Sequence, residues 1–104
     1  MPAPSNRVLL DLNSPEFQEA LFALELSDLQ QVVKGLGRLR GQDWNGIYGH
    51  TGLHWEAVGH IKTPTGAKAY SIRLSRKIRA IVYRHRDYLR IVSLHPDHDS
   101  AYRR

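Results

Sequence analysis

Residues 70–83 read YSIRLSRKIRAIVY, and this stretch decides the fold. Apolar side chains alternate with other residues in both of its halves, which is typical of β-strands that bury one face. The apolar residues of the two halves meet on one side only when Leu74 pairs with Ile78. That register leaves the three residues between them as a loop, and it predicts that Arg73 lies directly opposite Arg79 on the other face.

The predicted arginine pair needs an explanation, because like charges directly opposite each other on two strands repel by about 0.2–1 kcal/mol. Arg76 and Lys77 add two more positive charges in the adjacent loop. One interpretation is a solvent-exposed basic face with long, mobile side chains. The other is a surface that binds an anion such as the phosphate of a nucleic acid. Both interpretations stay open on this hairpin alone.

Outward from this hairpin, apolar spacing and turn residues predict the other elements. Ser14 is a good helix N-cap, and Pro15 suits the first helical position. In chain order we expect a strand at 8–12, a helix from 15, a second helix capped by 27–28 and ending at 41, a Gly-rich loop at 42–53, and strands at 54–61, 69–74, 78–83 and 89–94. This order predicts an α+β fold: an N-terminal strand, an antiparallel two-helix hairpin on one sheet face, and an antiparallel β-meander.

Length and composition limit the class of protein. A chain of 104 residues is expected to form a single domain, 1–104. The absence of cysteine excludes a disulfide framework, a thiolate zinc site and a cysteine nucleophile. No apolar run has the length of a membrane span, and the first residues do not read as a signal peptide, so we expect a cytoplasmic protein without a membrane partner.

Charge is distributed unevenly along the chain. The net charge is +5, yet residues 1–33 are acidic, with Arg7 as their one cation. From Lys34 onward the chain is strongly basic. Such asymmetry favours an anionic partner, and the crowding of cations around the central hairpin favours nucleic acid.

Three pieces of sequence, within the predicted order of elements, resemble the RelE/ParE toxin superfamily of bacterial toxin–antitoxin systems. Residues 36–41 look like the Gly-terminated end of the second helix in that family. Residues 70–74 and 78–83 are similar to its paired central strands, and residues 98–102, HDSAY, are similar to its His-to-Tyr ending. The resemblance implies a toxin of the RelE, HigB or YoeB type that inhibits translation by endonucleolytic cleavage of mRNA in association with the ribosome.

The resemblance also implies catalytic residues. Arg79 matches the central-strand arginine that contacts the scissile phosphate, and Arg73 matches a basic position on the neighbouring strand. His98 and Tyr102 match the C-terminal pair that supplies proton transfer or orientation. Glu56 is compared with the glutamate base of YoeB-type members, with an ordinary exposed strand glutamate as the competing interpretation.

Further residues are expected to hold the RNA. They are Lys62, Lys68, Arg76, Lys77, Arg84 and Trp44. The cations suit flanking phosphates, and Trp44, in the predicted loop, suits stacking on a base. No cofactor is expected. A metal site at His95 and His98 is disfavoured, because Pro96 lies between them and no ligand-spacing motif is present; His95 sits where family members vary.

The expected partners are a cognate antitoxin, mRNA and ribosomal RNA. Two alternatives stay open: a ParE-like inhibitor of DNA gyrase, and a non-catalytic module of the same fold that binds RNA or a partner. The chain departs from the family in an extra stretch at 55–68 and in having no long helix after Tyr102.

Overall fold

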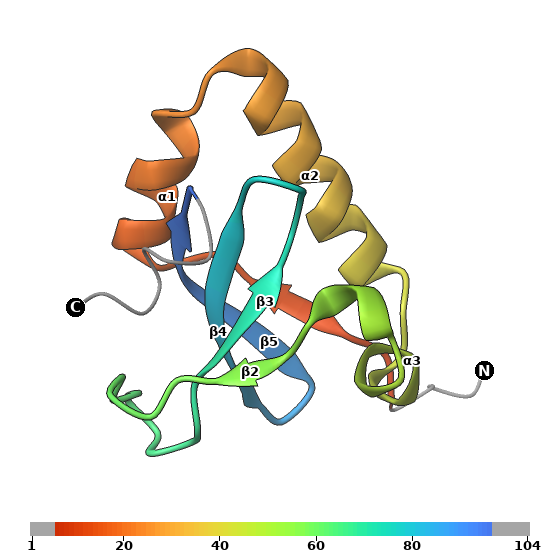
Figure 1. Cartoon of the computed structure of the whole chain (residues 1–104). Helices are drawn as coiled ribbons and strands as arrows, with labels where there is room; N and C mark the ends of the chain where they lie inside the picture. Colours follow the sequence, from red (N-terminus) through yellow and green to blue (C-terminus); the bar gives the residue numbers. More distant parts are fainter. Residues whose placement is uncertain (1–5, 97–104) are drawn as a thin grey trace.

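The computed structural model describes residues 6–96, and it confirms the predicted α+β fold: a five-stranded sheet with helices on one face (Figure 1). The strands are β1 (Leu9–Asp11), β2 (Glu56–Ala57), β3 (Tyr70–Arg73), β4 (Arg79–His85) and β5 (Tyr88–His95). The helices are α1 (Pro15–Phe22), α2 (Leu26–Arg40), α3 (Trp44–Tyr48) and the short 3-10 helix η1 (Thr51–Leu53). Within the described part of the chain, no helix is long and apolar enough to cross a membrane.

The strand order is β1-β5-β4-β3-β2. Strands β2 to β5 form the predicted antiparallel meander, whereas β1 pairs with β5 in parallel. A parallel neighbour requires a crossover connection, which the two helices provide. The first strand of the chain therefore lies beside the last one.

Ser14 begins α1 as predicted, and it also attaches the helix to the sheet. Its Oγ accepts a hydrogen bond from the Phe17 backbone N–H at 3.2 Å, which satisfies a free donor of the first turn. The same hydroxyl donates to the carbonyl of Val92 in β5 at 2.7 Å. One side chain thus sets both the start of α1 and its position on the sheet.

Helix α2 stops at Gly41 as predicted, with Arg40 as its last residue and Gly41 as its C-cap, but it begins at Leu26 with Glu25 at the N-cap. The predicted cap at Ser27 and Asp28 is therefore wrong by two residues. Asp28 lies in the first helical turn, where its charge suits the helix dipole, and its carboxylate pairs with Lys77 at 3.3 Å. This ion pair connects α2 to the loop between β3 and β4.

The predicted loop at 42–53 contains two helical segments, so that prediction is wrong. Asp43 caps α3 by accepting a hydrogen bond from the Gly46 N–H at 2.7 Å. Trp44 and Ile47 are spaced three residues apart and are both buried in the core. Burial of this apolar pair, together with the cap, outweighs the low helix propensity of the glycines nearby.

The strand predicted at 54–61 is reduced to the two residues of β2. His54 has a positive φ of 51°, which interrupts an extended chain before the strand begins. After β2 the chain turns over the sheet, and Val58 and Ile61 pack with Ala69 against Ile81 of β4. These residues form a small apolar cluster apart from the main core, and it covers part of the sheet face that the helices leave free.

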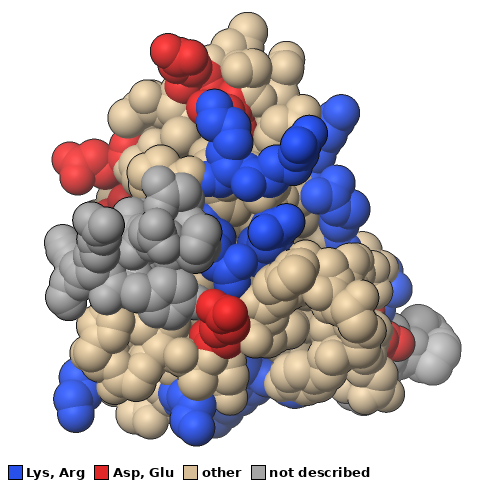
Figure 2. All heavy atoms as spheres, viewed as in Figure 1, with Lys and Arg blue, Asp and Glu red and all other residues tan. Residues whose placement is uncertain are grey.

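The main core lies between the helices and one face of the sheet. Helix residues such as Phe17 and Leu36 pack there against Ile72, Ala80 and Leu94 of three neighbouring strands. Because side chains alternate along a strand, the residues between these point to the opposite side, which we call the helix-free face. Lys and Arg side chains gather over the β3–β4 hairpin and the neighbouring part of α2, while acidic side chains lie mainly toward α1 (Figure 2).

Candidate functional site on the helix-free face

The register of the central hairpin places Arg73 directly opposite Arg79, as predicted. The loop between them has no glycine; instead Ser75 Oγ accepts hydrogen bonds from the backbone N–H groups of Lys77 at 3.3 Å and Ile78 at 3.1 Å. A serine hydroxyl can accept hydrogen bonds from the free backbone N–H groups of a tight turn in this way. The local hydrogen bonds thus hold the two arginines side by side.

Two rows of side chains cross the helix-free face. One row follows the cross-strand partners Arg73, Arg79 and His95 on β3, β4 and β5. The adjacent row is Glu56, Ser71, Ile81 and Ser93 on β2 to β5. We call the six polar members of these rows the cross-strand site: Glu56, Ser71, Arg73, Arg79, Ser93 and His95.

Arg79 is the anchored member of the site, with only 5% of its surface exposed. Its Nε donates to Ser71 Oγ at 2.7 Å, and its Nη2 donates to the carbonyls of His54 at 2.8 Å and Ser71 at 3.2 Å. The carboxylate of Glu56 lies 4.0 Å from the same Nη2. A buried charge is tolerated when it is paired and hydrogen-bonded in this way. The guanidinium is therefore fixed in place, in contrast to the mobile side chain that a simple basic surface implies.

Glu56 and His95 flank the arginine pair from the two outer strands of the site. The Glu56 side chain is 59% exposed and lies beside Arg79. The His95 ring is half-buried, and its Nε2 lies 2.9 Å from Ser93 Oγ. A carboxylate and an imidazole are both groups that exchange protons readily, so the site combines two cations with two proton carriers.

His95 was given no role by the sequence, and this is the residue that sequence reasoning missed. The predicted last strand ended at Leu94, whereas β5 includes His95 and pairs it with Arg79. A longer last strand alone would not have found it, because the β4–β5 register shifts by one residue between Ile81 and Val82, and an unbroken register would place Leu94 opposite Arg79. The two predicted catalytic residues His98 and Tyr102 lie outside the described residues.

The residues predicted to hold RNA do not all lie together. Arg76 and Lys77 are exposed in the loop next to the arginine pair, as the hairpin register predicted. Lys62 and Lys68 are exposed in the segment that crosses the helix-free face. These four cations are on or next to the side of the sheet that carries the cross-strand site.

The structure does not place Arg84 and Trp44 with the other residues predicted to hold RNA. Trp44 is 1% exposed, and its indole N–H donates to the Asp87 carbonyl at 3.2 Å, so it cannot offer a ring face to a base. Arg84 pairs with the core residue Leu89, which places its side chain on the helix-covered side of β4. There the guanidinium lies 4.0 Å from the centre of the Trp44 ring and donates to the Tyr48 hydroxyl at 3.0 Å.

A second charged group occupies the β1 end of the helix-free face. Arg90 Nε lies 3.2 Å from Asp11 Oδ2, and Arg90 Nη1 donates to the Tyr83 hydroxyl at 3.4 Å. That hydrogen bond is the main cause that raises the pKa of Arg90. Because its charge is already paired with Asp11, this arginine adds little free positive charge. Within residues 6–96, no group of three His, Asp or Glu side chains is arranged to hold a metal ion.

The fold defined by these elements is RelE-like. Searches with family models and against curated proteins found no match to the sequence. The chain is similar in structure to the crystal structure of an archaeal RelE–RelB complex from Pyrococcus horikoshii OT3, with a TM-score of 0.59 and 14% sequence identity. The likeness covers 90% of this chain and 97% of that one. At this identity the comparison establishes the fold.

Proposed function

We propose that this protein is the toxin of a toxin–antitoxin pair and that it inhibits translation by cleaving mRNA. The RelE-like fold supports the first part, since the similar structure was solved as a RelE–RelB complex. The observation that carries the second part is the cross-strand site. There Arg73 and Arg79 lie side by side between a carboxylate and an imidazole.

RNA cleavage without a metal ion requires a base, an acid and positive charge. The base removes the proton from a ribose 2′-hydroxyl, and the 2′-oxygen forms a bond to the adjacent phosphorus. The bond from phosphorus to the 5′-oxygen breaks, and the acid donates a proton to that leaving oxygen. The products are a 2′,3′-cyclic phosphate and a free 5′-hydroxyl, so all atoms and protons are balanced.

The residues of the site divide these roles. Arg73 is exposed and contacts the phosphate, while the anchored Arg79 supplies fixed positive charge beneath it. Charge that is fixed beforehand stabilises a developing phosphorane without reorganisation. Glu56 is assigned as the base and His95 as the acid, because they flank the arginine pair on opposite sides. The predicted contribution of His98 and Tyr102 to proton transfer stays a prediction.

The RNA strand is held by cations next to the site. Lys62, Lys68, Arg76 and Lys77 bind phosphates that flank the scissile one, and their contribution weakens as salt rises. The antitoxin is proposed as the partner that covers this basic face, because a complementary acidic segment both neutralises the charge and blocks the RNA.

The test compares the wild type with Glu56→Gln in cells and in solution. Because Gln has the shape of Glu but cannot act as a base, we expect cleavage of a single-stranded RNA to fall by about 10²-fold or more, with the fold unchanged. The product of the wild type should carry a 2′,3′-cyclic phosphate, and a 2′-deoxy substitution at the scissile nucleotide should abolish cleavage.

Glu19→Gln is the matched control, since Glu19 is exposed on α1, away from the site. Growth arrest with intact messages and damaged DNA would contradict the proposal and indicate a gyrase inhibitor. Equal cleavage by the wild type and Glu56→Gln would remove Glu56 from the mechanism and leave the activity itself in place.

A further inference from the structure

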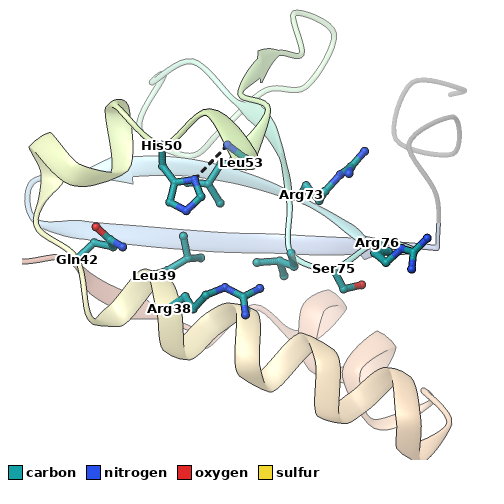
Figure 3. Close-up of a pocket in the computed structure, with 11 residues that line it drawn as sticks. Arg38, Leu39, Gln42, His50, Leu53, Arg73, Ser75 and Arg76 are labelled. Carbon is teal, nitrogen blue, oxygen red and sulfur yellow. Dashed lines mark hydrogen bonds between the residues drawn. The ribbon is translucent and has the colours of Figure 1, made fainter.

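A cavity of about 200 Å³ lies between α2, η1 and the β3–β4 hairpin (Figure 3). Its floor is apolar and is formed by Leu39 of α2, Leu53 of η1 and Leu74 of the hairpin. Each of these leucines belongs to the main core, so the floor is rigid. The mechanism proposed above uses Arg73 and Arg76 at the rim, but it gives no role to the interior of the cavity.

Three arginines surround the cavity. Arg38 comes from α2, whereas Arg73 and Arg76 come from the hairpin, and their side chains run outward from the rim of the cavity (Figure 3). Within residues 6–96, none of these three guanidinium groups has a carboxylate at ion-pair distance, whereas neighbouring Lys77 is paired with Asp28. Unpaired positive charge gathered around one opening favours an anionic ligand.

Neutral hydrogen-bonding groups complete the lining. His50 Nδ1 accepts a hydrogen bond from the Gly52 N–H at 3.1 Å, so in the neutral ring the proton is on Nε2, which is then a donor (Figure 3). The amide of Gln42 supplies both a donor and an acceptor. Such groups match the edges of an unpaired nucleobase, which carry donors and acceptors side by side.

The size of the cavity limits its ligand. Sites for whole small molecules usually enclose about 300–1,000 Å³. The smaller volume here suits one flat group whose face lies on the apolar floor while its charged neighbours stay at the rim. A nucleobase between two phosphates has this combination of an apolar face, a polar edge and flanking negative charge.

We infer that the cavity is a nucleotide subsite for single-stranded RNA, which holds one base on the leucine floor and the flanking phosphates on Arg38 and Arg76. Arg73 lines both this cavity and the cross-strand site. An RNA strand bound at the arginine pair therefore reaches the cavity by passing Arg73, which lies beyond the part of β3 that pairs with β2. The inference rests on the proposed function and adds a specificity-determining contact to it. An acidic peptide is less suited, because it would leave the two neutral polar groups and the apolar floor unused.

The experiment compares Arg38→Gln with Arg40→Gln, two exposed positions of α2 that lose the same charge; Arg40 does not line the cavity. Each protein is titrated by fluorescence anisotropy with a short single-stranded RNA that has a 2′-deoxy group at the scissile nucleotide and is not cleaved. A series of the same RNA carries an abasic site at each position in turn. Thermal unfolding checks that both variants are folded.

We expect Arg38→Gln to weaken RNA binding by about tenfold, the effect of losing one arginine that contacts a specific nucleotide. Arg40→Gln should weaken it much less. One abasic position should weaken binding to the wild type and to Arg40→Gln, but should add nothing in Arg38→Gln, because the base contact and the arginine act at the same subsite.

Equal losses in the two variants at every abasic position, with RNA still bound, would overturn the subsite and leave the proposed function standing. A wild type that binds no RNA would overturn both. If Arg38→Gln loses affinity for a short Glu-rich peptide and not for RNA, the cavity serves an acidic protein segment and the assignment to RNA is wrong.

Discussion

Arg79 combines an anchored position in the fold with a proposed role in the chemistry. Its guanidinium is nearly enclosed and bonded to Ser71 and to the His54 carbonyl, yet it is adjacent to a second arginine at residue 73. The bonds to Ser71 and His54 stabilise the buried charge, and the repulsion from Arg73 is the part that stability alone does not explain. A bound phosphate would relieve that repulsion.

Replacing Arg79 with lysine tests the anchoring role. Lysine keeps the charge but cannot donate from Nε to Ser71 and from Nη2 to His54 in the same geometry. We expect Arg79→Lys to lower the free energy of unfolding by about 1–3 kcal/mol, as measured by urea denaturation, because buried acceptors lose their partners. Arg73→Lys is the control on the exposed neighbour, and its effect should stay within about 0.5 kcal/mol. Equal stability of the two variants would show that the bonds of Arg79 contribute nothing to folding.

At the scale of elements, α2 packs tightly against the β3–β4 hairpin at Gly35. A Cβ added at Gly35 would lie 2.4 Å from the carbonyl oxygen of Leu74. Only a glycine at this position lets the helix backbone come this near to the hairpin. The same contact forms one wall of the arginine-lined cavity, so the packing of α2 sets its width.

Gly35→Ala is therefore expected to destabilise the protein although alanine favours helices. The clash with Leu74 forces α2 away from the hairpin, and overpacking of this kind costs about 1–3 kcal/mol. Gly37→Ala, two residues further along the same helix, meets no atom within 4 Å and should stabilise the protein by up to about 1 kcal/mol. Urea denaturation of both variants measures the difference, and the same sign for both would refute the tight contact.

The sequence predicts the structure best at positions where local sequence patterns and tertiary packing favour the same conformation. Alternation and loop length together are enough to place Arg73 opposite Arg79, because a shift of one residue would turn the apolar side chains of the two strands to opposite faces of the sheet. The cap at Ser14 is equally local, since it depends on a few consecutive residues. The order of strands and helices follows from such local signals.

What the sequence could not predict depends on contacts between distant residues. Trp44 sits in a Gly-rich stretch, and its burial beside the Asp87 carbonyl helps to turn that stretch into α3. Arg84 follows a strand pattern, but the side of the sheet that it occupies depends on how far β4 extends. Glu56 reaches Arg79 through a β2 pairing of only two residues, which is too short to show a period.

At the scale of the whole molecule, positive charge is concentrated around the hairpin and is countered by few acidic groups there (Figure 2). For single-stranded RNA, each contacted phosphate adds about 0.7 to the slope of log affinity against log salt. We expect Arg76→Gln to reduce this slope by about 0.7 in titrations between low and physiological salt. Arg84→Gln should leave the slope unchanged, since its guanidinium lies over Trp44 on the helix-covered side. A lower slope in Arg84→Gln would place RNA on that side of the sheet.

The pairing of β1 with β5 has a consequence for the newly made chain. β1 is synthesised early, yet its partner is the last strand of the meander, and the row through Arg79 is completed by His95 in that same strand. Contacts between strands that are far apart in sequence form late, because they require closure of a long loop. A ribosome making this protein therefore carries an incomplete sheet until β5 has emerged. The proposed cross-strand site is incomplete until the same point, because β5 carries His95.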